Sequence, residues 1–134
     1  ENHQLMGDLR QAKLERIADD YPETEIVGDE DAEICMLGWG STWAAIHAAV
    51  QRQRRDGKKL AWIHLEHLNP LPNDLGEKLK RFDKVLVPEL NRGQLCHLVR
   101  GKYLVDAQSI SKVAGLPFRT KEIEAAIEAA RSAQ

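Results

Sequence analysis

The chain has 134 residues, of which 43% are hydrophobic and 30% are charged, and its net charge is −2. This length suits one soluble globular domain around a single core, and the near-neutral charge excludes a general polyanion-binding protein. The apolar runs are far shorter than the roughly 20 residues that cross a bilayer, so no membrane contact is expected. A start at Glu1, without an initiator Met or an apolar leader, favours a cytoplasmic piece of a longer chain over a processed protein.

The first 20 residues have the period of a helix with a narrow apolar stripe. The stripe consists of Leu5, Leu9, Ala12 and Ile17. Tyr21-Pro22 should end this helix, because the residue before a proline resists the α conformation. We therefore predict a connector helix from a preceding domain at residues 1–21 and the domain itself at residues 22–134.

From residue 24 onward, short apolar segments alternate with helical ones. The predicted strands are 24–28 (a short edge strand), 32–37, 60–65, 84–88 and 103–108. The predicted helices are 43–55, 74–81, 93–101 and 121–130, the last with Thr120 as its N-cap. Such alternation is typical of βαβ units, and it predicts an α/β fold with a mostly parallel sheet covered by helices on both faces.

The turn between the first inner strand and its helix, residues 38–42 (GWGST), is the most informative local motif. Glycine permits a sharp turn, and Ser41 can cap the helix that follows. A helix start also suits a phosphate or carboxylate, but neither a third glycine nor a Lys-Ser/Thr pair completes a nucleotide-binding fingerprint. Simple capping is the favoured interpretation, and anion binding is the alternative.

Ligands of open α/β sheets bind beyond the carboxyl ends of the strands, where four loops are expected at 38–42, 67–72, 89–93 and 108–112. Their polar residues are Ser41, His67, Asn69, Glu89, Asn91, Arg92, Gln94 and Ser109. They contain no nucleophile with its base. Glu89 and His67 can perform acid–base chemistry only if they converge, and Glu89 can equally bind backbone amides or Arg92.

Two further groups receive structural interpretations. His64 and His67 point to opposite faces of a strand and lack further ligands, so no metal site is expected. Cys35 and Cys96 are interpreted as buried thiols that form no disulfide.

A basic cluster of Arg52, Arg54, Arg55, Lys58 and Lys59 stands where one helix ends. Cations are favoured at that end of a helix, so a solvated surface is the preferred interpretation. Docking of an acidic partner or of nucleic acid is the alternative. Because no aromatic residues are interleaved in the cluster, no nucleic acid is expected among the partners.

Several segments resemble one known family. They are 87–95 (VPELNRGQL), 102–106 (KYLVD), 112–118 (KVAGLPF) and, upstream, 37–42 (LGWGST) and 67–72 (HLNPLP). In this order and spacing they resemble the α subunit of 2-oxoacid:ferredoxin oxidoreductases, and the 2-oxoglutarate type in particular. The resemblance covers most of the chain.

The resemblance implies a transketolase C-terminal-like domain: three α/β/α layers with about five strands, of which the edge strand at 24–28 runs antiparallel. The full enzyme would convert a 2-oxo acid and CoA into acyl-CoA and CO2 and pass electrons to ferredoxin. Its thiamine diphosphate, Mg and iron–sulfur cluster would lie in other domains or subunits, so no cofactor and no catalytic residue is assigned to this chain. Alone, the domain should be inactive.

The role implied for the domain is support within an oligomer, against a preceding pyrimidine-binding domain and the β subunit, with ferredoxin only an indirect partner. The candidate ligand or interface residues are Gly38, Gly40, Ser41, Thr42, Asn69, Glu89, Asn91, Arg92 and Gln94. Arg92 departs from the small or apolar residue expected there, which marks a subtype or an interface. The alternative function is a free-standing anion or nucleotide-binding module that uses the 38–42 turn.

Overall fold

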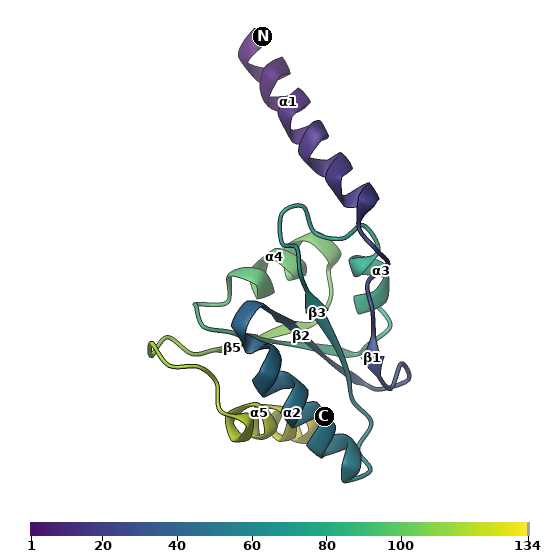
Figure 1. Ribbon diagram of the computed structural model, residues 1–134, viewed down its shortest axis with the longest axis vertical. Helices are drawn as coiled ribbons and strands as arrows, with labels where there is room; N and C mark the ends of the chain where they lie inside the picture. The colour runs from purple at the N-terminus through teal and green to yellow at the C-terminus, as the bar shows by residue number, and fades with distance from the viewer. Residues whose placement is uncertain (134) are drawn as a thin grey trace.

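A computed structural model describes residues 1–133 and places a five-stranded sheet between two layers of helices (Figure 1). The order of the strands across the sheet is β1-β3-β2-β4-β5. In chain order their bounds are β1 Val27–Gly28, β2 Ile34–Trp39, β3 Ala61–Leu65, β4 Lys84–Glu89 and β5 Ala107–Ser111. β1 pairs antiparallel with β3, and all other pairs are parallel. The predicted α/β class, the helix-covered sheet and the antiparallel edge strand are therefore confirmed.

Helices cover both faces of the sheet. α3 (Leu75–Leu79) and α4 (Gln94–Tyr103) lie on one face, and α2 (Trp43–Arg55) and α5 (Thr120–Ser132) lie on the other (Figure 1). The central strand β2 supplies both cores: Cys35 and Leu37 pack into the first cluster, and Ile34 and Met36 into the second. All four side chains are fully buried, which explains why the strand is a continuous apolar run rather than an alternating one.

β1 is only two residues long, although residues 24–28 were predicted to form it. Val27 lies opposite Trp62, but Asp74 binds the backbone N–H of Thr24 at 2.8 Å. The carboxylate of Asp74 also accepts a hydrogen bond from the Thr24 hydroxyl. These bonds hold the chain before Val27 to the start of α3 instead of to β3, so the strand is shorter than its sequence pattern suggests.

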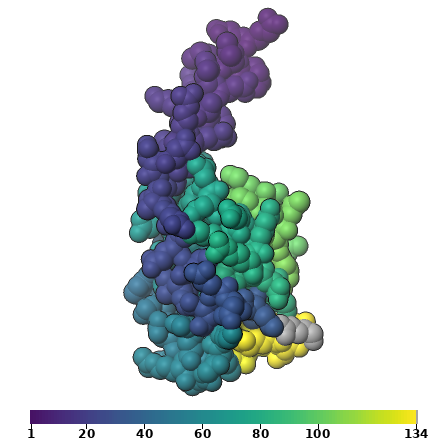
Figure 2. Space-filling model, turned by 90° about the vertical axis from the view of Figure 1, so that its right-hand side faces the viewer, coloured from purple at the N-terminus to yellow at the C-terminus, as the bar shows by residue number. Residues whose placement is uncertain are grey.

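The N-terminal helix α1 (Asn2–Glu15) continues into a 3-10 turn, Arg16–Asp20, and projects away from the sheet (Figures 1 and 2). None of the residues of α1 is buried, and Leu5 and Leu9 are 56% and 55% exposed. The predicted helix is thus present and its apolar stripe has no partner among residues 1–133. The division of the chain at residue 22 stays a prediction. No helix in this described part is long and apolar enough to cross a membrane.

The last strand and the last helix differ from the prediction. A strand was expected at 103–108, but α4 runs to Tyr103 and β5 begins at Ala107. Tyr103 is helical because its ring packs on Gly76 of α3, where even a methyl group would come within 2.4 Å of the ring. The N-cap of α5 is Arg119 rather than Thr120, and its N–H donates to the Glu122 carboxylate at 2.6 Å.

A polar clasp ties the segment before β1 to α3. Lys78 is only 8% exposed, and its ammonium group lies 2.8 Å from Glu23 and 3.5 Å from Asp74. It also donates to the carbonyl oxygen of Thr24. Burial raises the pKa of Asp74, but the hydrogen bonds from Thr24 and the cation of Lys78 outweigh this, so the pKa lies below its ordinary value.

We predict that Asp74→Ala lowers the free energy of unfolding by about 1.5–3 kcal/mol, the usual contribution of hydrogen bonds to a charged group. Because the folded state depresses the pKa of Asp74, its contribution should be complete above the ordinary carboxyl pKa of about 4 and disappear as the pH falls below it. Urea unfolding at neutral and acidic pH measures both effects. Asp8→Ala on the exposed α1 is the control, and an equal loss in that variant would contradict the role of the clasp.

Candidate functional site

Four parallel strands end at the same edge of the sheet, at Leu65, Trp39, Glu89 and Ser111. Most of the candidate residues predicted from the sequence lie on the turns that follow β2, β3 and β4. Gly38 and Glu89 lie near the ends of β2 and β4, and Gln94 is the first residue of α4. The prediction of a fourth loop at residues 108–112 is wrong. Gln108 and Ser109 lie within β5, and the connection to α5 starts after Ser111. The edge is therefore built from three turns and the longer 112–119 segment.

The turn after β2 is a short 3-10 turn, Gly40–Thr42, that leads directly into α2. Gly40 has φ +58, so the predicted need for glycine in the turn is confirmed. The predicted cap is wrong: Thr42, not Ser41, occupies the N-cap of α2, and no side chain caps that helix. Buried Thr42 instead donates its hydroxyl to the Trp39 carbonyl at 2.8 Å and accepts the Trp39 N–H at 3.3 Å.

The two glycines of this turn have different functions. A methyl group on Gly38 would lie 2.5 Å from Cδ1 of Ile46, so this glycine allows α2 to pack closely on β2. A methyl group on Gly40 would have no atom within 4 Å, and Ser41 beside it is exposed. Within residues 38–42, Gly40 and Ser41 are the exposed residues, so the turn is open to an outside group there.

Glu89 is the most deeply buried carboxylate among residues 1–133, with 1% exposure. It accepts hydrogen bonds from the backbone N–H groups of Leu95 (2.9 Å) and Cys96 (3.1 Å), and from the side-chain amide of Asn91 (3.2 Å). Of the two partners left open by the sequence, backbone amides or Arg92, the structure has the amides. Glu89 is a fixed anion that stabilises the start of α4.

Asn91 completes this arrangement. Its side-chain oxygen accepts the backbone N–H groups of Gly93 (2.7 Å) and Gln94 (3.0 Å). Together Asn91 and Glu89 bind four consecutive N–H groups at the start of α4. This helix start therefore has no donors left for a phosphate or carboxylate ligand, whereas the neighbouring Arg92 and Gln94 side chains are exposed.

The remaining polar candidates do not converge on Glu89. His67 is exposed and stacks on Tyr21, with ring centroids 4.2 Å apart, and Asn69 is exposed in the same loop. A hollow of about 170 Å³ does lie at the edge, lined by Trp39, Leu68, Glu89, Gln94, Leu95 and Leu98. Its lining is mostly apolar and its one carboxylate is already bound to amides, so it offers no acid–base pair.

The basic cluster at the end of α2 is largely neutralised by its own acidic neighbours. Arg54 contacts Asp29 at 2.8 Å, and Arg52 lies 3.8 Å from Glu124 of α5. Lys58 pairs with Glu128, and Lys59 pairs with Asp31. These pairs favour the interpretation of a solvated surface over a docking site for an acidic partner.

Both cysteines are buried as predicted. Burial raises the pKa of the Cys35 thiol far above its ordinary value. The pKa of Cys96 is also raised, first by burial and then by the nearby Glu89 carboxylate. Buried thiols with raised pKa values are poor nucleophiles, so the structural interpretation of both cysteines is favoured.

Thiamine diphosphate with Mg²⁺ does not fit the start of α4. A diphosphate needs free N–H donors and Mg²⁺ needs free carboxylates, but the donors of α4 and the Glu89 carboxylate are bound to each other. Within residues 1–133, no three His, Cys, Asp or Glu side chains are grouped so that they could hold a metal ion.

We predict that Glu89→Gln destabilises the fold by about 1–3 kcal/mol. Both oxygens of Glu89 accept backbone N–H groups, so in the variant the side-chain NH2 would replace one of these oxygens and leave one backbone N–H without an acceptor. Chemical denaturation measures this loss, and Glu77→Gln on the exposed side of α3 is the control. A stable Glu89→Gln variant would show that the carboxylate is not needed at the start of α4.

Comparison with known proteins places the chain. Residues 32–126 match the family model of the pyruvate:ferredoxin oxidoreductase core domain II. The chain is 50% identical over 130 residues to the 2-oxoglutarate oxidoreductase subunit KorA of Mycobacterium tuberculosis, which covers 96% of this chain and 20% of that protein. It is 38% identical over 96 residues to 2-oxoacid:ferredoxin oxidoreductase 1, subunit alpha, of Aeropyrum pernix, covering 67% of this chain and 15% of that one.

A solved structure agrees with these relatives. It is the 2-oxoglutarate:ferredoxin oxidoreductase from Magnetococcus marinus with 2-oxoglutarate, coenzyme A and succinyl-CoA bound. The TM-score is 0.86 at 30% identity, and the match covers 96% of this chain and 23% of that chain. The chain thus spans only about a fifth of the length of the first relative. It belongs to the family of pyruvate:ferredoxin oxidoreductase core domain II.

Proposed function

We propose that this chain is the non-catalytic accessory domain of a 2-oxoacid:ferredoxin oxidoreductase α subunit of the 2-oxoglutarate type. The observation that carries the proposal is the 50% identity to a 2-oxoglutarate oxidoreductase subunit over 96% of the chain. The full enzyme would convert 2-oxoglutarate and CoA into succinyl-CoA and CO2 in the cytoplasm and pass the electrons to ferredoxin.

The absence of catalysis in this domain is supported by what its polar groups already bind. Glu89 and Asn91, at the edge where α/β sheets usually bind ligands, saturate the start of α4. Thiamine diphosphate with Mg²⁺ and the iron–sulfur cluster would accordingly belong to other domains and subunits. Thiamine diphosphate would supply the carbanion chemistry of decarboxylation there.

The domain's own role would be to pack against the pyrimidine-binding domain and the β subunit. The exposed members of the candidate set are Gly40, Ser41, Asn69, Arg92 and Gln94. They lie on the turns that follow β2, β3 and β4, except Gln94, which is the first residue of α4. Exposed side chains on rigid turns suit contacts between domains. Glu89 and Thr42 would act indirectly, because they hold these turns in place.

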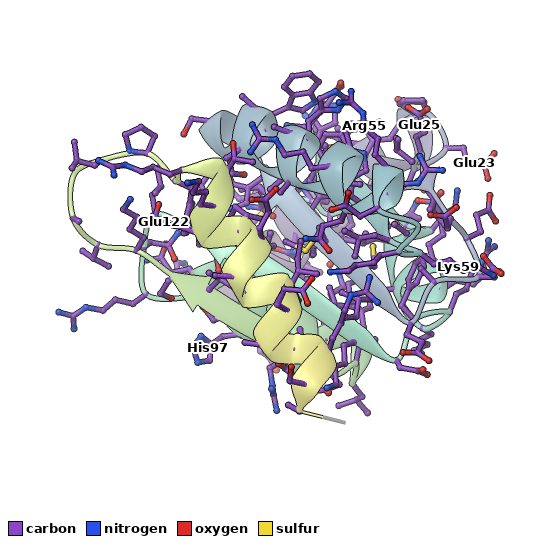
Figure 3. All side chains as sticks on the ribbon, turned by 90° about the horizontal axis from the view of Figure 1, so that it is seen from below. Glu23, Glu25, Arg55, Lys59, His97 and Glu122 are labelled. Atoms are coloured by element: carbon purple, nitrogen blue, oxygen red, sulfur yellow. The ribbon has the colours of Figure 1, made fainter. Side chains whose placement is uncertain are left out.

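The function is tested by producing the full-length α subunit together with its partner subunit and measuring ferredoxin reduction. We expect ferredoxin reduction that depends on CoA and on a 2-oxo acid. The rate with 2-oxoglutarate should be at least ten times the rate with pyruvate. Arg92→Ala should lower the rate by weakening contacts between domains. Arg55→Ala is the control and should leave the rate unchanged, because Arg55 is the last residue of α2 and lies at the end of that helix away from the turn after β2 (Figure 3). Failure to reduce ferredoxin with any 2-oxo acid would contradict the proposal.

The alternative, a free-standing anion or nucleotide-binding module, retains one structural argument: the surface at Gly40 and Ser41 is open. Calorimetry on the 134-residue chain separates the two functions. As an accessory domain it should release no heat of binding with thiamine diphosphate, CoA or inorganic phosphate. Micromolar binding of any of them that is lost in Gly40→Ala would favour the alternative, since the added methyl group strains the turn.

A further inference from the structure

β5 is the edge strand on one side of the sheet, and half of its backbone groups point outward. The Val85 N–H donates to Asp106 and the Lys112 N–H donates to Glu89, so the even-numbered residues of this segment face β4. Because backbone direction alternates along a strand, Ala107, Ser109 and Ser111 face away from β4.

Only part of this outer edge has partners within residues 1–133. Ala107 is satisfied, since its N–H donates to Val105 at 2.9 Å and its carbonyl accepts from Arg100 at 2.8 Å. The backbone groups of Ser109 and Ser111 have no such bonds in this described part, and both residues are exposed. Two neighbouring donor and acceptor pairs thus remain at the outer edge.

The features that usually protect an edge strand are missing here. The sequence of β5, AQSIS, contains neither a charged residue nor a proline. The three most exposed large hydrophobic side chains of the described part flank it: Leu104 (88%), Val113 (68%) and Leu116 (61%). Leu104 also has φ 56, a costly conformation for a leucine.

The opposite edge of the sheet is different. β1 is two residues long, and the segment before it carries Glu23 and Glu25. Figure 3 shows these two glutamates on one side of the molecule and His97, from α4 beside β5, on the other. Shortness and charge are the usual protection of an edge, so β5 alone is open to pairing.

We propose that β5 pairs antiparallel with β5 of a second copy of this chain, about a twofold axis at Ile110. Ser109 would then lie opposite the partner's Ser111, and Ser111 opposite the partner's Ser109. Each of these pairs would exchange two backbone hydrogen bonds, and the two five-stranded sheets would become one continuous sheet.

The register follows from which groups are free. A twofold axis at Ser109 would bring Ala107 opposite Ser111, but the backbone groups of Ala107 are already bound. With the axis at Ile110, the new hydrogen bonds use only the backbone N–H and C=O groups of Ser109 and Ser111, which are unbonded within residues 1–133. Ile110 would face its own copy as a non-hydrogen-bonded pair, on the side of the sheet covered by α5.

The charges near the axis agree with this register. Gln108 would lie opposite Lys112, and Asp106 would be the diagonal neighbour of Lys112, so no like charges meet. The two most exposed leucines of the described part, Leu104 and Leu116, precede and follow β5 in the chain and lie outside the paired segment.

The test is a disulfide at the axis in the full-length protein that carries this chain. Directly opposed residues of a non-hydrogen-bonded pair have Cα atoms about 4.5 Å apart, within the range of a disulfide. We expect Ile110→Cys to form a covalent dimer in a glutathione redox buffer, seen on a non-reducing gel. The native Cys35 and Cys96 are buried and do not interfere.

Gln108→Cys is the matched control, on the same face of the same strand. In the proposed register two cysteines at position 108 are four residues out of step, or about 13 Å apart, so dimer formation should be at least tenfold lower. Equal cross-linking of both variants, or none in Ile110→Cys, would overturn the proposal. Absence of cross-linking in Ile110→Cys is also the result expected if another segment of the enzyme covers β5, and it overturns the proposal in that case too.

A second pair of variants tests the backbone bonds. Ser109→Pro, made in the Ile110→Cys protein, removes an N–H that points outward and does not serve the pairing with β4, so the fold should persist. Circular dichroism checks the fold, and cross-linking should fall at least tenfold. Ser109→Ala retains the N–H and should cross-link as before. Undiminished cross-linking of a folded Ser109→Pro protein would refute strand pairing.

Discussion

The structure depends on one constraint: its central strand β2 must be covered on both faces. Ile34 and Met36 point to one side and Cys35 and Leu37 to the other, and all are fully shielded from water. A parallel sheet with such a strand is stable only as the middle layer of three, because each exposed apolar face would cost the burial energy of a core. The crossover helices and the common edge where the strands end follow from this requirement.

That common edge is the usual ligand site of open α/β sheets, but in this chain its strongest polar groups hold the protein itself together. The buried Glu89 carboxylate is surrounded by N–H donors from the start of α4, and Asn91 takes the next donors in line. Because the Glu89 carboxylate already occupies the N–H donors at the start of α4, an anionic ligand has no free donors to bind at that position. This internal saturation agrees with the supporting role proposed for the domain, since function depends on the site and not on the fold.

The surface features divide in a similar way. The cations at the end of α2 are paired with acidic groups on α5 and on the turn before β2, so they hold elements of one domain together. The exposed apolar residues concentrate instead on α1 and at both ends of β5. In a protein whose relatives are several times longer, such positions are where contacts with other domains or copies are to be expected.

The sequence by itself determined the class of fold and the order of strands and helices along the chain, because apolar periodicity and glycine positions are local properties. The family was indicated separately, by the resemblance of several short segments in a fixed order. The sequence also identified Glu89 as a residue that could bind amides. Only the tertiary structure decided that it does so, that Tyr103 stays helical against Gly76, and that Thr24 leaves the sheet for Asp74. These outcomes depend on contacts between segments that the fold brings together. A local sequence pattern does not encode such contacts.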